Sequence, residues 1–352
     1  MNGFFSMLSK AVQRKISAHY KVDLSHASIS SLGGGDVNVA YKIRTAQESF
    51  VLKKIQLNVY AKEYQASLDD IVSSLYFIES ICRNLSIQGN VSTAVEVLGD
   101  PFLILKDAAY ILYPFIEGKI LENENITCNM VSLIAKKLYQ LHHCPQIYDK
   151  EFSEKKFRLY KEIGLSALQH PHLKKIHTIL NIIPLLKRLN RILTFFNDNQ
   201  SRFQQAVKNM SCETVCHNDL KPKNVLWTTP ELFWIIDWEA ASDFDHKVDY
   251  LDTLLAWSVE AKNKILDINL SKVLAFQKEY FIEPRILRDA VYVVLLKWLF
   301  WFYFCLSKTL KHPYRILHYR YHASLALDYM ELIIGKRELN FLSKGDEKNA
   351  PD

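Results

Sequence analysis

The chain has 352 residues, of which 49% are hydrophobic and 23% are charged. This composition excludes a disordered or collagen-like protein and provides enough apolar side chains for two or three domain cores. Lys and Arg number 44 against 38 for Asp and Glu, and the net charge of +6 is too small to indicate a nucleic-acid partner.

The N-terminal segment has apolar residues at helical spacing from Phe4 to Ile16, with basic residues between them. No uninterrupted apolar stretch follows, so it is not a secretory signal. The pattern predicts an amphipathic helix that packs on the body of the protein, and a helix at a membrane surface is the alternative interpretation.

The next part of the chain, from about residue 28 to residue 116, carries strand patterns. One segment inside it, residues 68–85, has helical periodicity instead. The pattern predicts an antiparallel sheet of about five strands with one long helix. The short β-type runs are residues 37–45, 49–55, 93–97, 101–105 and 108–115.

After Gly118 the pattern becomes helical. Following a short interruption, it is helical again from residue 249 to about residue 334. The apolar run Ala290–Leu306 is short for a membrane span and contains Lys297, so we expect a buried helix rather than a span. The earlier helices are expected over residues 130–143, 157–168, 173–196 and 203–210.

A short β island interrupts the helical part. The runs Val225–Trp227 and Leu232–Ile236 are joined by Thr228–Glu231, which has the composition of a hairpin turn. An isolated hairpin inside a helical region is unusual, and the most polar segments of the sequence flank it on both sides.

Those flanking segments are CHNDLKPKN at residues 216–224 and IIDWE at residues 235–239. A hairpin brings its ends together, so we expect Asn224 and Asp237 to lie close to each other. An amide oxygen with carboxylates forms a hard-oxygen site of the kind that Mg²⁺ binds. Asp219, on the loop before the hairpin, is a candidate to orient a hydroxyl group and accept its proton.

The six cysteines form no CxxC pair and no secreted disulfide pattern. They predict free thiols in a reducing compartment, and we therefore expect a cytoplasmic protein. Cys212, Cys216 and His217 allow a zinc site as an alternative, although their spacing matches no standard zinc pattern.

The residues around the hairpin resemble the catalytic loop and metal-binding segment of the protein-kinase-like fold. More narrowly, they resemble those of aminoglycoside phosphotransferases and choline kinases. The resemblance implies that Asp219 is the catalytic base, that Asn224 and Asp237 bind Mg²⁺ with help from Glu239, and that His217 braces the loop.

The resemblance also implies the fold class, which is α+β with two lobes. Residues 1–115 are expected to form a small antiparallel β-sheet lobe that binds the nucleotide. Residues 116–335 are expected to form a larger, mainly helical lobe with the catalytic and substrate-binding residues, and residues 336–352 a polar tail.

The expected nucleotide site begins at a glycine-rich loop. The sequence GGGDVN at residues 33–38 resembles the Gly-Gly-x-x-Asn loop of the phosphotransferase group, and Phe50–Lys53 resembles the strand with the phosphate-binding lysine. Alternation along that strand places Val51 and Lys53 on one face and Lys54 on the other. The nucleotide-binding residues implied by this likeness are Gly33, Gly34, Gly35, Asn38 and Lys53.

Two further parts of the nucleotide site follow from the resemblance. Lys53 is expected to pair with a carboxylate of the long helix, for which Glu79 is the first candidate and Glu63 the rival. The stretch 110–118, with Tyr113 and Phe115, resembles the hinge whose backbone binds adenine.

The activity implied is transfer of the γ-phosphoryl group of ATP, with Mg²⁺, to a hydroxyl group of a small molecule. The absence of an Ala-Pro-Glu segment after Asp237 and the Asp-Trp-Glu sequence favour this over a protein kinase, and a silent kinase-like binding module is the other alternative. Asp243 and Asp245 with Glu239 predict either an acidic rim, which would attract a cationic acceptor such as an amino sugar or a choline-like amine, or a solvated acidic turn.

Overall fold

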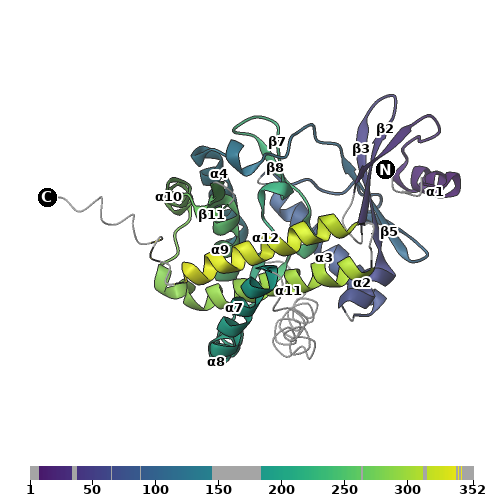
Figure 1. Ribbon diagram of the computed structural model, residues 1–352. Helices are drawn as coiled ribbons and strands as arrows, with labels where there is room; N and C mark the ends of the chain where they lie inside the picture. Colours follow the sequence, from purple (N-terminus) through teal and green to yellow (C-terminus); the bar gives the residue numbers. More distant parts are fainter. Residues whose placement is uncertain are drawn as a thin grey trace. The chain divides into compact units, whose positions relative to one another are not determined.

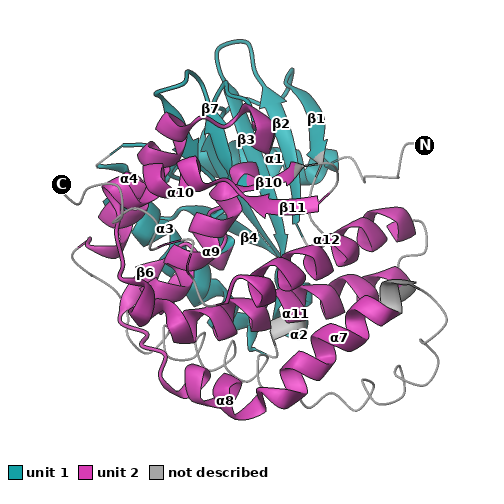
Figure 2. Cartoon of the chain, turned by 60° about the vertical axis from the view of Figure 1, so that its left-hand side comes forward, with its two compact units in different colours: residues 1–120, 147–152, 224–239 teal, residues 121–146, 153–223, 240–352 magenta. Residues whose placement is uncertain are grey.

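The computed structural model describes residues 8–33, 38–64, 66–87, 89–144, 184–262, 265–311 and 315–337, with residues 340 and 342. These residues fall into two compact units, which Figure 2 shows in different colours. The first unit contains the described residues up to Ile120 together with 224–239, and the second contains the remaining ones.

The first unit contains a five-stranded sheet in the order β1-β2-β3-β5-β4, in which neighbouring strands are antiparallel. Figure 1 labels most of the elements along the chain. The elements of the first unit are α1 (Lys10–Tyr20), β1 (Ser28–Gly33), β2 (Asn38–Arg44), β3 (Ser49–Gln56), α2 (Leu57–Tyr64), α3 (Leu68–Ser86), β4 (Phe102–Leu105), β5 (Ala108–Pro114), β7 (Val225–Trp227) and β8 (Phe233–Ile235).

The sheet confirms the expected number of strands but not the identity of one of them. Ser28–Gly33 forms β1, whereas residues 93–97 form no strand. The reason is that the backbone N–H groups of this segment bond to separate acceptors. The N–H of Ala94 donates to the Glu79 carboxylate at 3.2 Å and that of Val95 to the Leu112 carbonyl at 2.7 Å, so no ladder of bonds develops.

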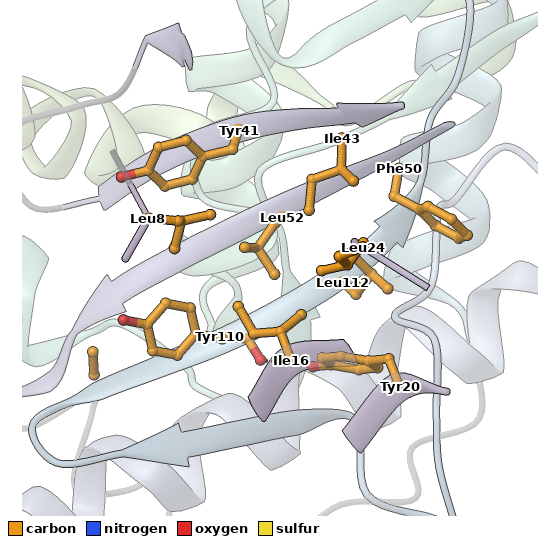
Figure 3. Close-up of a cluster of buried hydrophobic side chains, with 11 residues drawn as sticks. Leu8, Ile16, Tyr20, Leu24, Tyr41, Ile43, Phe50, Leu52, Tyr110 and Leu112 are labelled. Atoms are coloured by element: carbon orange, nitrogen blue, oxygen red, sulfur yellow. Dashed lines mark hydrogen bonds between the residues drawn. The ribbon is translucent and has the colours of Figure 1, made fainter. Parts of the chain in front are cut away.

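Alternation along the strands gives the sheet two apolar faces. Leu52 and Leu112 lie on one face, where they cluster with Ile16 and Tyr20 of α1 (Figure 3). This packing confirms the predicted N-terminal helix from Lys10 onward, while Phe4 lies outside the described residues. The other face holds the alternate residues of the same strands, and these pack on α2 and α3. Ile55, Ala109 and Ile111 of the strands cluster there with Leu57 of α2 and with Ile71 and Leu75 of α3.

Leu52 offers a direct test of the α1 face because its side chain is fully buried at the centre of the sheet. We expect Leu52→Ala to lower the free energy of unfolding by about 2–5 kcal/mol, through lost burial and the cavity left behind. Chemical denaturation of the full chain measures this. Leu98→Ala is the matched control, since Leu98 is 99% exposed; equal losses for the two variants would contradict the assigned packing.

The β7–β8 hairpin belongs to the first unit, although its residues fall in the expected second lobe. Backbone hydrogen bonds explain this: Lys119 and Trp227 exchange two N–H···O bonds of 2.9 Å, and the N–H of Ile235 donates to the Asn90 carbonyl at 2.8 Å. The compact units therefore differ from the expected division at residue 115, since 116–120 and 224–239 cluster with the sheet.

The second unit is mainly helical, with two small β ribbons, β6–β9 and β10–β11. The β10–β11 ribbon corrects the expectation of continuous helix after residue 249. The predicted helix 157–168 and most of the polar tail lie outside the described residues. The elements are α4 (Cys128–His142), α7 (Pro184–Asp198), α8 (Gln200–Lys208), β6 (Thr214–Cys216), β9 (Ser242–Phe244), α9 (His246–Ser258), β10 (Val259–Lys262), β11 (Ile265–Ile268), α10 (Leu270–Glu279), α11 (Arg288–Lys311) and α12 (Ile316–Gly335).

The apolar run around Lys297 forms α11, which packs against α8, α9 and α12 within the second unit. In the described part of the chain, Pro284–Thr309 is the one helical segment long and apolar enough to cross a membrane by length and composition. Packing inside the protein buries 56% of its apolar window and so accounts for part of its hydrophobicity.

Candidate active site

Lys53 lies at the centre of a charged cluster in the first unit. Its ammonium is 2.8 Å from Oδ1 of Asp237 and also forms an ion pair with Glu239. Alternation along β3 places Lys53 on the same face as Ile55, the face that α2 and α3 cover. The structure thus brings together three residues that the sequence singled out, 184 positions apart in the case of Lys53 and Asp237.

The charges of this cluster hold the lysine in its protonated form. Burial alone would lower the pKa of Lys53, but the carboxylates of Glu239 and Asp237 outweigh that effect and raise it above its ordinary value. One ammonium faces two carboxylates, so the cluster carries an excess negative charge that suits a cation.

The ends of the hairpin meet as expected. Val225 pairs with Ile235, and the N–H of Ile236 donates to the carbonyl of Asn224 at 2.9 Å. Asp237 follows with a φ of +63°, a left-handed conformation that non-glycine residues rarely adopt. Strained backbone of this kind is concentrated at functional sites, and here it belongs to the predicted metal ligand.

Asn38 and Tyr60 complete the surroundings of Glu239. The side-chain amide of Asn38 and the hydroxyl of Tyr60 both donate to Oε2 of Glu239, and the same amide donates to the Tyr60 oxygen at 3.0 Å. Oδ1 of Asn38 is buried without a hydrogen-bond partner among the described residues. Tyr60 was not predicted, because a tyrosine in a short helix carries no sequence signal for this role.

The oxygen atoms of this cluster fit a divalent cation. Asp237 and Glu239 supply carboxylate oxygens, which are the hard ligands that Mg²⁺ prefers. The backbone carbonyl of Asn224 accepts the N–H of Ile236, so Asn224 lies beside the residue that precedes Asp237. The orphaned amide oxygen of Asn38 adds a buried acceptor beside Glu239. The donor set therefore agrees with the expected metal site.

Glu79 has different partners from those expected. Its buried carboxylate accepts hydrogen bonds from the Tyr113 hydroxyl and from the N–H of Ala94, and the described residues include no ion pair between Glu79 and Lys53. Burial raises the pKa of Glu79, although these two donors and the charge of Lys53 act in the opposite direction. The rival, Glu63, lies in α2, and its side chain is outside the described residues.

The remaining nucleotide-binding predictions are described in part. Gly33 ends β1 beside an irregularity in the β1–β2 register, and Gly34 and Gly35 lie outside the described residues. In the hinge, Tyr113 pairs with Val51 in the sheet, and the N–H of Phe115 donates to the Ser49 carbonyl at 2.9 Å. The Phe115 N–H therefore has a partner within the protein.

Asp219 lies in the second unit, on the loop between β6 and the hairpin. Its carboxylate is 2.8 Å from the ammonium of Lys221 and 3.2 Å from that of Lys223. Burial would raise the pKa of Asp219, but the two lysines lower it below its ordinary range. The carboxylate is therefore ionised throughout the neutral range and is able to accept a hydrogen bond from a hydroxyl group.

Buried polar groups hold this loop. Asp249 accepts the N–H groups of His217 and Asn218, each at 2.9 Å, and is itself bonded by Nε2 of His142 at 3.1 Å. The N–H of Asp219 donates to Nδ1 of the fully buried His217 at 3.3 Å, which confirms that His217 braces the loop.

The predicted acidic rim is wrong. Asp243 and Asp245 are 1% and 2% exposed. Asp245 caps α9 by accepting the N–H of Lys247 at 2.9 Å, and it also accepts the N–H of Ser211. The third member, Glu239, is engaged with Lys53. Acidic residues close together in sequence suggest a charged surface, whereas the tertiary structure buries Asp243 and Asp245 and uses Asp245 as an acceptor for backbone N–H groups.

Comparison with known proteins agrees with the family resemblance seen in the sequence. A family model described as "Phosphotransferase enzyme family" matches residues 28–270. An uncharacterized protein of Metamycoplasma hominis is 23% identical over 181 residues, which are 51% of this chain and 32% of that protein. The chain thus spans about a third of the length of the curated relative that it matches.

Solved structures with a similar fold cover nearly the whole chain. A spectinomycin phosphotransferase in complex with ADP and spectinomycin has a TM-score of 0.63 at 17% identity, over 95% of this chain and 99% of that one. An ethanolamine kinase from Plasmodium vivax has a TM-score of 0.56 at 12% identity, over 95% and 94%. A choline kinase from Streptococcus pneumoniae has 0.54 at 16%, over 90% and 98%. These likenesses confirm the predicted fold class.

Proposed function

Because the chain belongs to the phosphotransferase enzyme family, we propose that it transfers the γ-phosphoryl group of ATP, with Mg²⁺, to a hydroxyl group of a small molecule. The observation that supports this most directly is the meeting of Lys53, Asp237 and Glu239 in one charged cluster. Phosphoryl transfer needs positioning and neutralisation of phosphate charge more than covalent chemistry, and these residue types serve both needs.

In this proposal Lys53 binds phosphate oxygens, which replace one or both of its carboxylate partners when the nucleotide is present. Asp237, Asn224 and Glu239 would hold Mg²⁺, which neutralises charge that develops on the phosphate oxygens. Asn38 and Tyr60 orient Glu239 through their hydrogen bonds to Oε2.

Asp219 orients the acceptor hydroxyl and takes its proton as the acceptor oxygen bonds to the γ-phosphorus and the bond from that phosphorus to the ADP oxygen breaks, so that ADP leaves. Its low pKa makes it a weak base, so orientation of the hydroxyl is the larger part of its contribution. Asp219 stands five residues before Asn224 in the chain, on the loop that leads into the hairpin.

For the acceptor we propose a hydroxyl-bearing amine or amino sugar as the first class to test. The support comes from the names of the similar structures, which include spectinomycin and choline or ethanolamine as substrates. The buried Asp243 and Asp245 do not contribute to this proposal. We also propose a cytoplasmic location, supported by six free cysteines.

ADP release with a panel of hydroxyl-bearing amines, sugars and vitamins tests the activity, and thermal shift with ATP, with and without MgCl₂, tests binding. We expect Mg²⁺-dependent stabilisation by ATP and release of ADP with at least one acceptor. Binding without hydrolysis or transfer would favour a silent module instead. Labelling of proteins in an extract, without transfer to any small molecule, would favour a protein kinase.

A further inference from the structure

A lysine in the middle of the apolar helix α11 carries the inference. The ammonium of Lys297 donates to the carbonyl of Asn218 at 3.0 Å and pairs with Oδ2 of Asp252 at 2.7 Å. The Asp252 side chain is 5% exposed and that of Lys297 is 26% exposed, so this ion pair is partly buried. A partly buried charge is costly unless it is partnered, and here Asn218 and Asp252 both lie in the second unit with Lys297.

Asn218 is the residue that needs to be held. Its φ of +63° places a non-glycine residue in the left-handed region, which such residues adopt uncommonly. Its N–H donates to the Asp249 carboxylate at 2.9 Å, and its carbonyl accepts from Lys297. An anion and a cation thus bind the two backbone groups of one strained residue.

The bond from Lys297 acts on the peptide that leads directly into Asp219. The carbonyl of Asn218 and the N–H of Asp219 belong to the same planar peptide unit. Lys297 binds its oxygen, and Nδ1 of His217 accepts its N–H at 3.3 Å. Both polar groups of this peptide unit are hydrogen-bonded, so the orientation of the peptide plane is fixed. The position of the Asp219 backbone, from which its side chain extends, is fixed with it.

From this geometry we infer that Lys297 is a positioning residue for Asp219. A direct electrostatic effect of Lys297 is the less suitable explanation, because its charge is balanced by Asp252 while Lys221 and Lys223 are the ion-pair partners of Asp219. The inference rests on the proposed function, in which Asp219 orients the hydroxyl that is phosphorylated.

The test compares Lys297→Met, Lys297→Arg and a matched control. Lys272 is a buried lysine of the same unit, whose ammonium donates to the Asn123 carbonyl at 2.9 Å and pairs with Glu260 at 2.7 Å. Lys272→Met therefore removes the same kind of clamp from a different loop. Three quantities are measured: hydrogen exchange of the 217–219 amides, ATP hydrolysis with water as acceptor, and MgADP affinity.

For Lys297→Met we expect about 10-fold or faster exchange at 217–219 and about 10²-fold slower hydrolysis, with MgADP affinity unchanged, because the catalytic group is displaced while the nucleotide residues are intact. Lys297→Arg should recover part of both losses. Lys272→Met should leave loop exchange and hydrolysis at wild-type values. If Lys297→Met does not fold, Asp252→Asn, which frees the ammonium from its anchor, is measured instead.

Wild-type exchange and hydrolysis in Lys297→Met, or equal loop exchange in the Lys272→Met control, would overturn the inference. Failure of the proposed function gives a different pattern. In that case the unaltered protein neither binds MgADP nor hydrolyses ATP, and the exchange of residues 217–219 still decides whether Lys297 holds the loop.

Discussion

Asp219→Asn is expected to reduce phosphoryl transfer by about 10²–10⁴-fold, the range typical for loss of a positioned general base. The substitution keeps the size of the side chain but removes the charge that aligns the acceptor hydroxyl. ADP release measures the loss, with the acceptor found in the panel or with water.

Nucleotide affinity should stay within about twofold, since Asp219 accepts a proton and binds no nucleotide in this proposal. Asp267→Asn is a suitable control, because Asp267 is a half-exposed aspartate of the same unit. Normal turnover in Asp219→Asn, or loss of ADP binding with turnover retained, would refute the assigned role.

Asp237→Asn is expected to abolish the increase in nucleotide affinity that Mg²⁺ produces. A unit charge about 4 Å away contributes roughly 4 kcal/mol at an effective dielectric constant of about 20, so the loss could reach about 10³-fold. Calorimetric titration of ADP at increasing MgCl₂ measures it. Lys53 keeps Glu239 as a partner in this variant, and the first unit should therefore remain folded.

Glu231→Gln provides the matched control for Asp237→Asn. Glu231 lies on the exposed turn of the same hairpin, where its carboxylate accepts from the Thr229 hydroxyl. Its loss should leave both binding and Mg²⁺ dependence unchanged. A full Mg²⁺ effect in Asp237→Asn would remove this aspartate from the metal site and leave Glu239 and Asn224 as the candidates.

Local sequence patterns determined much of the fold and of the candidate site of this protein. The alternation in β3 placed Val51 and Lys53 on one face, and the turn residues between 227 and 232 predicted a hairpin whose ends carry Asn224 and Asp237. The HNDLKPKN segment indicated the loop with Asp219. Side-chain direction in a strand and the type of a turn depend on residues a few positions apart, and so a sequence is enough to predict them.

Only the tertiary structure decided which charged groups meet and which are buried. Lys53 bonds Asp237 and Glu239 rather than Glu79, which is engaged with Tyr113 and Ala94. Asp243 and Asp245 are buried, and Lys297, a lysine in an apolar run, holds the backbone before Asp219. Each of these outcomes depends on distances and desolvation set by segments far apart in the chain, where several carboxylates compete for one cation and no local pattern selects between them.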